Sequence, residues 1–212
     1  MEGPTTTLVR KAYARWAPVY DILYDKLTEP AARAAVNAAV EAGPRILEAG
    51  VGTGLSLGYY PAHTEVHGVD LSADMLKRAA EKVTRHGLNH VKSLQVMDVC
   101  ELDFPDSCFD AVSAQFIITL VPDFKAAMNE FSRVIRPGGS IVLVNHFGAP
   151  KGVIAQVERV AAPVVKRIGW SSDFKVRQVE EWARSTGAFD VDAPQPVFPA
   201  GFFKMLRLKK RR

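Results

Sequence analysis

The sequence predicts a single α/β domain in which a mostly parallel sheet carries helices on both faces. Strand-like and helix-like patterns alternate through the middle of the chain, which is typical of parallel strands joined by crossover helices. One apolar strand runs directly into a glycine-rich turn. The length of 212 residues and the hydrophobic content of 48% suit one sizeable core.

Each strand of the predicted sheet is a short apolar run that ends at a polar or turn-forming residue. Five such runs are Arg45–Ala49, Glu65–Asp70, Val91–Val96, Phe109–Gln115 and Ser140–Asn145. The pattern changes beyond Asn145, and two further strands are expected around Phe189–Val191 and Phe202–Leu208.

Helices are predicted between the strands from apolar residues at helical spacing. Ser72 is a suitable N-cap for one helix, whose buried face would carry Met75, Leu76, Ala79, Ala80 and Val83. Another begins at Asp123 and is stopped by Arg136-Pro137-Gly138-Gly139, which should turn the chain into the next strand. Helical spacing returns over about 153–168 and near Val176–Ser185.

The glycine-rich turn indicates a nucleoside-containing cofactor. Strand 45–49 continues as Gly50-Val51-Gly52-Thr53-Gly54, and Asp70 ends the following strand twenty residues after Gly50. Glycines let a ligand approach the backbone closely, and a carboxylate at this distance can hold a ribose diol. Leu55 occupies the place of the third glycine in a dinucleotide fingerprint, so a pyrophosphate site is not specified.

The acidic residue before the turn favours a positively charged cofactor. Glu48 would repel a phosphate but attract a sulfonium or an ammonium, and S-adenosylmethionine carries both of these and no phosphate. The stretch from Glu48 to Gly54 resembles the first motif of class I S-adenosylmethionine-dependent methyltransferases, E/D-x-G-x-G-x-G. This resemblance implies a Rossmann-like, seven-stranded sheet whose last strand is antiparallel.

The same resemblance implies a role for each residue at the carboxyl ends of the strands. Gly50, Gly52 and Gly54 would pass under the methionine part, with Glu48 near its ammonium or sulfonium. Asp70 would accept hydrogen bonds from the ribose. The adenine would lie on Leu71 and Met75, with Asp98 accepting from its amino group and the Val99 N–H donating to its ring. Gln115 and Phe116 would face the methionine amine. S-adenosylhomocysteine would be the product.

The segment after the fourth strand argues against nucleic acid as the acceptor. Enzymes that methylate adenine or amide groups carry Asn/Asp-Pro-Pro-Tyr/Phe there, whereas this chain has Ala114-Gln115-Phe116-Ile117. It also lacks a Pro-Cys pair for cytosine C5 chemistry. No cluster of acids suggests a magnesium site, so no metal is expected.

Aromatic residues near the N-terminus suit a cationic amine. Tyr13, Trp16, Tyr20 and Tyr24 occur at spacings of three and four, and aromatic faces attract methylated ammonium groups by about 0.5–2 kcal/mol per contact. The same stripe could instead pack on the core or lie at a membrane interface. Residues 1–30 are predicted to form an amphipathic helical segment that caps the active site of a methyltransferase domain over 31–212.

Four features together resemble bacterial phosphatidylethanolamine N-methyltransferases of the Rhodobacter type. These are the Tyr-x-x-x-Ala-Pro-x-Tyr-Asp opening over 13–21 and the Glu-Ala-Gly-Val-Gly-Thr-Gly motif, followed by Val69-Asp70-Leu71-Ser72 and by His146 after the fifth strand. The resemblance implies up to three methyl transfers to phosphatidylethanolamine, ending at phosphatidylcholine, on an anionic membrane surface reached from the cytosol. Related ubiquinone and menaquinone C-methyltransferases share the Tyr-Asp opening.

The distribution of charge fits such a surface. The formal net charge is +4, and no acid follows Asp192, whereas basic residues crowd the end: Lys204, Arg207, Lys209, Lys210, Arg211 and Arg212. This basic region and the N-terminal helix could bind acidic headgroups at roughly 1 kcal/mol per well-placed residue, although a basic tail that serves only solubility is an equal alternative. No apolar run is long enough to span a bilayer, so we expect a cytoplasmic protein associated peripherally with the inner face of the cytoplasmic membrane.

An ethanolamine amine must lose a proton before it attacks the methyl group. His146 and a tyrosine, Tyr24 or Tyr20, are candidates to accept that proton. Tyr20 could instead cover the methionine part of the cofactor. Tyr13, Trp16, Asn145 and Lys151 are the candidate substrate-binding residues, with Lys151 pairing with the lipid phosphate.

Three other functions remain open. A quinone or another small acceptor could replace the lipid. An NAD(P)-dependent oxidoreductase is a different class, disfavoured because none of the five tyrosines starts Tyr-x-x-x-Lys. A cofactor-binding module without catalysis is the third.

Overall fold

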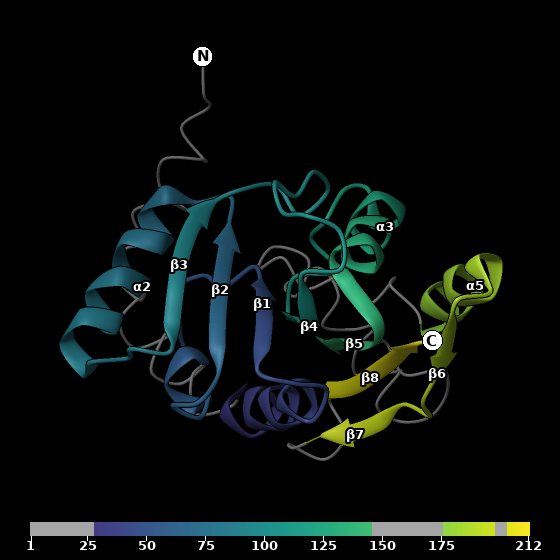
Figure 1. The fold of residues 1–212 in the computed structure, drawn as a ribbon, viewed down its shortest axis with the longest axis horizontal. Coiled ribbons are helices and arrows are strands. Elements are labelled where there is room, and N and C mark those ends of the chain that lie inside the picture. Colours follow the sequence, from purple (N-terminus) through teal and green to yellow (C-terminus); the bar gives the residue numbers. More distant parts are fainter. Residues whose placement is uncertain (1–27, 146–175, 198–202) are drawn as a thin grey trace, which may run out of the picture.

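The computed structural model describes residues 28–145, 176–197 and 203–212, and in these ranges the chain forms one mixed sheet between two layers of helices (Figure 1). Eight described strands join in the order β3-β2-β1-β4-β5-β8-β6, with β7 paired to β8. Their bounds are β1 Arg45–Ala49, β2 Glu65–Asp70, β3 Val91–Val96, β4 Phe109–Gln115, β5 Ile135–Asn145, β6 Phe189–Val191, β7 Gln195–Val197 and β8 Phe203–Lys210.

Strands β1 to β5 pair in parallel, and β8 is antiparallel to each of its neighbours β5, β6 and β7. The predicted fold, a mostly parallel sheet with an antiparallel last strand, is therefore confirmed. The short strand β7 was not predicted, because it holds three residues, one of them Pro196, and no run of apolar residues marks it.

Strand β5 begins five residues earlier than the sequence predicts. The Arg136-Pro137-Gly138-Gly139 stretch does end the preceding helix, but it already belongs to β5, whose Ile135 pairs with Phe109 of β4. The pairing register then shifts between Phe109 and Ala111. A β-carbon on Gly139 would lie 2.6 Å from the Asp110 carbonyl oxygen, so this glycine allows the close approach of the two strands.

The helices are α2 Ala73–His86, α3 Phe124–Val134 and α5 Val176–Thr186, together with a helical stretch over 28–40 and a short 3-10 helix, η1, at Leu57–Tyr59. Ser72 caps α2 by accepting a hydrogen bond from the Met75 N–H, as predicted, and Asp123 caps α3 in the same way. Residues 28–30 are continuous with 31–40, so the predicted division after residue 30 falls inside a helix.

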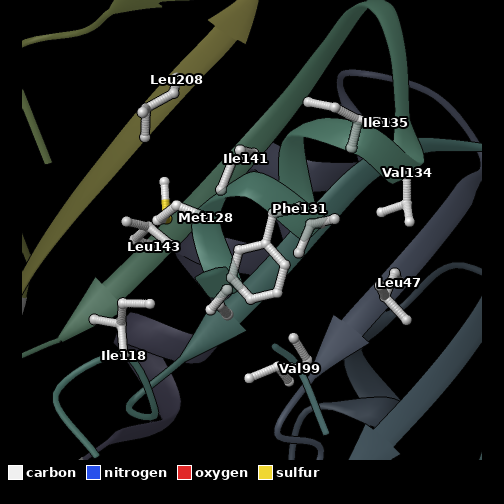
Figure 2. Close-up of a cluster of buried hydrophobic side chains, with 14 of the residues drawn as sticks. Leu47, Val99, Ile118, Met128, Phe131, Val134, Ile135, Ile141, Leu143 and Leu208 are labelled. Carbon is white, nitrogen blue, oxygen red and sulfur yellow. The ribbon is translucent and has the colours of Figure 1, made fainter. Parts of the chain in front are cut away.

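The sheet buries a separate apolar layer on each face. Alternate residues supply the two layers, so that Ile46 and Val142 face the helix 28–40 and α2, whereas Leu47 and Leu143 face α3 and α5. Figure 2 shows the second layer, with Phe131 of α3 at its centre.

The buried face of α2 is narrower than its sequence suggests. Leu76 and Ala79 are buried and Val83 is partly buried, whereas Met75 and Ala80 are exposed, contrary to the prediction. The helix lies beside β3 at one end of the sheet (Figure 1), where few of the described elements surround it. Met75 is therefore left available at the first turn of α2.

The loop that follows β3 is fastened to α3 by Arg133. Its Nη1 donates to the Phe104 carbonyl and its Nη2 to the Leu102 carbonyl, both at 2.7 Å. Glu130 pairs with Arg133 and accepts from the Leu102 N–H at 2.7 Å. These bonds fix the loop that carries Asp98 and Val99.

Among the described residues, no helix has both the length and the apolar character needed to cross a bilayer.

Candidate active site

The residues predicted to bind the cofactor gather at one edge of the sheet. Ala49, Asp70, Gln115 and Asn145 end β1, β2, β4 and β5, and these parallel strands point the same way, as the arrowheads of β1 and β2 in Figure 1 show. Ligands of open α/β sheets bind outside the carboxyl ends of the strands. This edge is therefore the candidate active site.

The three glycines of the turn all adopt left-handed backbone conformations, with φ of 71°, 54° and 71° at Gly50, Gly52 and Gly54. A β-carbon on Gly50 would collide with Ile117, and one on Gly54 would lie 2.7 Å from Leu57. A β-carbon on Gly52 would meet nothing within 4 Å. Gly50 and Gly54 thus allow close packing, whereas Gly52 presents bare backbone to open space, where a ligand can approach.

Asp70 joins the glycine turn to the start of α2. Its Oδ2 accepts from the Gly52 N–H at 2.8 Å and its Oδ1 from the Ser72 N–H at 2.9 Å. The side chain is only partly buried, and a carboxylate has about four acceptor positions. Asp70 can therefore hold the turn and still accept hydrogen bonds from the two hydroxyls of a ribose.

Three apolar side chains near Asp70 are left exposed by the described residues. Leu71 is 67% exposed, Met75 42% and Val96 59%. Leu71 follows Asp70, and Val96 lies directly opposite Asp70 in the β2–β3 pairing. A flat base bound here would remove these side chains from water. Val96 was not predicted from the sequence, because its place beside Asp70 is evident only from the strand register.

Asp98 and Val99 lie in the loop that Arg133 fastens. The Asp98 side chain is exposed, and its Oδ1 accepts from the Cys100 N–H at 2.8 Å. Val99 directs its side chain into the core beside α3 (Figure 2), so any contact with a ligand would come from its backbone, as the sequence implies.

Glu48 lies in a buried polar cluster rather than on the surface of the glycine turn. It is 3% exposed, and Ser56, just after the turn, donates a hydrogen bond to its Oε1. Its Oε2 and the Tyr60 Oη are buried, and neither makes a hydrogen bond of normal geometry within the described residues. Ser113 of β4 lies opposite Glu48 in the sheet. Ser56 and Tyr60 were not predicted, since both look like ordinary loop residues in the sequence.

Burial governs the ionisation of this cluster. It raises the pKa of Glu48 to about 7, and the hydrogen bond from Ser56 only partly opposes it. Burial, and then the nearby charge of Glu48, raise the pKa of Tyr60 well above its ordinary value. A carboxyl group with an unpaired oxygen in this position gains from a nearby positive charge, which is the charge that S-adenosylmethionine carries.

The chain turns sharply where β4 ends. Phe116 has a φ of 61°, which is uncommon for a residue other than glycine. Its N–H donates to the Val144 carbonyl at 2.7 Å, and its ring meets Phe203 edge-on at 5.1 Å between centroids. Gln115, just before it, is buried and donates to Ser113 Oγ at 3.0 Å. These contacts fix the backbone at the end of β4, where Gln115 and Phe116 are predicted to face the methionine amine.

Asn145 is buried at the end of β5, and its Nδ2 donates to Thr119 Oγ1 at 3.3 Å. The other residues predicted for catalysis, for substrate binding and for covering the methionine part lie outside the described residues; they are Tyr13, Trp16, Tyr20, Tyr24, His146 and Lys151. Within the described ranges, no group of three or more His, Cys, Asp or Glu residues is arranged to hold a metal ion.

We expect Gly52→Ala to separate ligand binding from folding. Gly87, the C-cap of α2, provides a matched control, because its φ is 59° and its β-carbon would also meet open space. Each substitution should lower the free energy of unfolding by about 1–2 kcal/mol, the cost of the left-handed conformation. Only Gly52→Ala should weaken the binding of S-adenosylhomocysteine, by about tenfold or more, in isothermal titration calorimetry. Equal affinities in the two variants would contradict this assignment.

Glu48→Gln should change how stability depends on pH. Because the folded-state pKa of Glu48, about 7, exceeds its ordinary 4.5, the folded protein holds an extra proton between these values, and the free energy of unfolding falls as pH rises through them. The loss is at most about 3.4 kcal/mol. The variant lacks this term, so its stability relative to the parent should rise between pH 5 and 8 in urea denaturation. Parallel pH profiles would show that Glu48 titrates normally.

A family model described as a methyltransferase domain, Methyltransf_11, matches residues 47–143, the range that contains the glycine turn, Asp70, Asp98 and the end of β4. Among solved structures, phosphoethanolamine N-methyltransferase 2 of Haemonchus contortus, in complex with phosphomonomethylethanolamine and S-adenosylhomocysteine, superimposes with a TM-score of 0.65. It is 20% identical, and the match covers 84% of this chain and 52% of that one. This likeness supports the fold.

Curated relatives extend the similarity over nearly the whole chain. A phosphatidylethanolamine N-methyltransferase of Cereibacter sphaeroides is 42% identical over 96% of this chain and 98% of its own length. A demethylmenaquinone methyltransferase of Thermus thermophilus is 37% identical over 70% of each chain. With the fold and the site described above, these matches show that the chain belongs to the class I S-adenosylmethionine-dependent methyltransferases, of the type represented by the Cereibacter enzyme.

Proposed function

We propose that this methyltransferase acts on the amine of phosphatidylethanolamine, in successive transfers toward phosphatidylcholine, at a membrane surface. The observation that carries the proposal is the 42% identity to the Cereibacter phosphatidylethanolamine N-methyltransferase, which extends over almost all of both chains. The aromatic N-terminal stretch, with Tyr13 and Trp16, adds support, because aromatic faces suit a nitrogen that gains methyl groups and a permanent charge.

The bound cofactor supplies an electrophilic methyl group on a sulfonium. The contribution of the chain is to bind, orient and exclude water. Gly52 offers room for the ligand, Asp70 accepts from the ribose, and the exposed side chains Leu71, Met75 and Val96 cover the base. Asp98 and the Val99 N–H complete the adenine contacts. Glu48, beneath the turn, favours the positive charge of the methionine part. Gln115 and Phe116 line the other side of the methionine part.

The acceptor amine approaches from the ends of β4 and β5. In this proposal His146, the residue after Asn145, accepts the proton that the ammonium loses, with Tyr24 as the alternative base. Tyr20 covers the methionine part. Tyr13 and Trp16 hold the methylated nitrogen, and Asn145 and Lys151 bind the rest of the headgroup.

Three of the described basic residues near the C-terminus are engaged within the fold, which limits their part in membrane binding. Arg207 pairs with Asp192 and Glu41, Arg211 pairs with Asp190, and Lys210 donates to the carbonyls of Ser132 and Ile135. These cations serve the fold. We therefore assign peripheral attachment to the inner face of the membrane mainly to the N-terminal segment, with a smaller contribution from the C-terminal strand.

Methylation of a quinone is the second candidate. It is favoured by the 37% identity to the Thermus demethylmenaquinone methyltransferase, although that match covers 70% of each chain. A quinone acceptor carries no amine and needs no anionic surface. The two functions therefore differ in both product and dependence on acidic lipid.

The proposal is tested by incubating the protein with radiolabelled S-adenosylmethionine and liposomes of phosphatidylethanolamine. The liposomes are prepared with and without phosphatidylglycerol. We expect label in mono-, di- and trimethylated lipid and faster labelling with the acidic lipid. Asp70→Ala, which removes the ribose acceptor and the support of the turn, should abolish cofactor binding and labelling together. Cofactor binding without any labelled lipid would overturn the lipid function. Label in the methylated quinone, when demethylmenaquinone is added to the liposomes, would establish the second candidate.

His146→Ala should leave cofactor binding intact and lower kcat by about 100-fold, the lower range for loss of a general base. Its rate should recover partly as pH rises, because the amine then loses its proton unaided. His86→Ala is the matched control, since His86 is exposed at the end of α2, and it should behave as the parent. Unchanged turnover of phosphatidylethanolamine in His146→Ala would remove this histidine from the mechanism.

A further inference from the structure

Lys204 lies at the same edge of the sheet as the cofactor residues. Because β8 runs antiparallel to β5, its first residues reach the carboxyl edge, and Lys204 pairs with Asn145, the last residue of β5. The other end of β8 lies at the opposite edge, where Lys209 pairs with Ser140. Of the cations in this strand, Lys204 is therefore the one beside the ends of β4 and β5.

The side chain of Lys204 shares a face of the sheet with that of Asn145. Leu206, two residues after Lys204, packs in the layer beside α3. Leu208 of β8 lies in the same layer, as do Ile141 and Leu143 of β5, four and two residues before Asn145 (Figure 2). Side chains of directly opposed residues have β-carbons about 4.5–5.5 Å apart. Thr119, next to Ile118 of the same layer, accepts from Asn145. Three polar side chains from three segments thus meet at this edge.

Lys204 is a partly buried cation for which the described ranges provide no counter-ion, whereas Lys209 is exposed and lies at the opposite edge of the sheet. Arg207 pairs with two carboxylates, and Lys210 donates to two carbonyls. For Lys204, the described ranges provide no ion pair and no hydrogen bond to its side chain, although it is partly buried. A ligand that brings a negative charge to this edge would give the Lys204 ammonium a charge-assisted partner.

We propose that Lys204 binds the phosphate of the acceptor headgroup, with Thr119 orienting the Asn145 amide beside it. This inference rests on the proposed phospholipid function. The phosphate stays the same through successive transfers, whereas the nitrogen changes from a primary to a quaternary amine. An anchor on the phosphate therefore presents the nitrogen in the same place in every round, and it also disfavours a quinone, which offers no anion to Lys204.

Kinetics in neutral mixed micelles of phosphatidylethanolamine and detergent test this role without a charged surface. Lys204→Gln should raise KM for the lipid by about tenfold or more, as expected for loss of a charge-assisted hydrogen bond, and should leave the affinity for S-adenosylhomocysteine unchanged. Lys204→Arg should restore most of the loss. Lys209→Gln removes the same charge from the opposite edge of the sheet and should match the parent.

Soluble inhibitors separate the phosphate from the amine. Glycerophosphoethanolamine should inhibit the parent better than Lys204→Gln, whereas ethanolamine, which has no phosphate, should inhibit both equally. Equal loss in Lys204→Gln and Lys209→Gln would indicate general surface charge and overturn the inference, as would an unchanged KM in Lys204→Gln. If the parent labels no phospholipid at all, the proposed function itself fails, an outcome distinct from a parent that is active and indifferent to Lys204.

Discussion

The Asp70 carboxylate is the interaction on which the arrangement of the site depends. Its two oxygens hold the N–H groups of Gly52 and Ser72, and so they connect the end of β2 to the glycine turn after β1 and to the first turn of α2. Gly50 and Gly54 are held by their own backbone hydrogen bonds, to the carbonyls of Val69 and Val51, and Asp70 adds the bond that holds Gly52 between them. The residue that is expected to receive the ribose thus also builds the surface on which the rest of the cofactor lies.

Most of the sheet could be predicted from the sequence, because its central strands are buried on both faces and their apolar runs begin and end abruptly. The bounds of β1 to β4 and β6 agree with the prediction. The start of β5 differs from the prediction, because proline and glycine usually interrupt a strand. Here Gly139 instead allows the backbone to pass close to Asp110. The exposure of Met75 was also not predicted, since helical spacing marks an apolar stripe but cannot show that no neighbour covers it.

The residues of the candidate site also divide into those that could be placed from the sequence and those that could not. The glycine turn, Asp70 and Asp98 could be placed from the sequence because a short motif at the end of a strand fixes its own geometry. Glu48 was singled out from the sequence as a site residue, but its burial with Ser56 and Tyr60 depends on how the chain folds back after the turn. Val96 and Lys204 were not among the predicted site residues, because each reaches the site through its pairing with a neighbouring strand, and strand pairing joins residues that are far apart in the sequence. These roles remain predictions for the experiments above.

The alternation of side chains in β8 has a consequence for how this family can vary in length. Even-numbered residues from Leu206 to Lys210 face α3 and α5, whereas Phe203 and Met205 face the opposite layer. If the pairing of β8 with β5 shifted by one residue, Arg207 and Lys209 would point into the apolar layer around Phe131. Leu206 and Leu208 would then point away from that layer. The strand is therefore locked in register, and an insertion or deletion ahead of Phe203 must be absorbed before the strand begins.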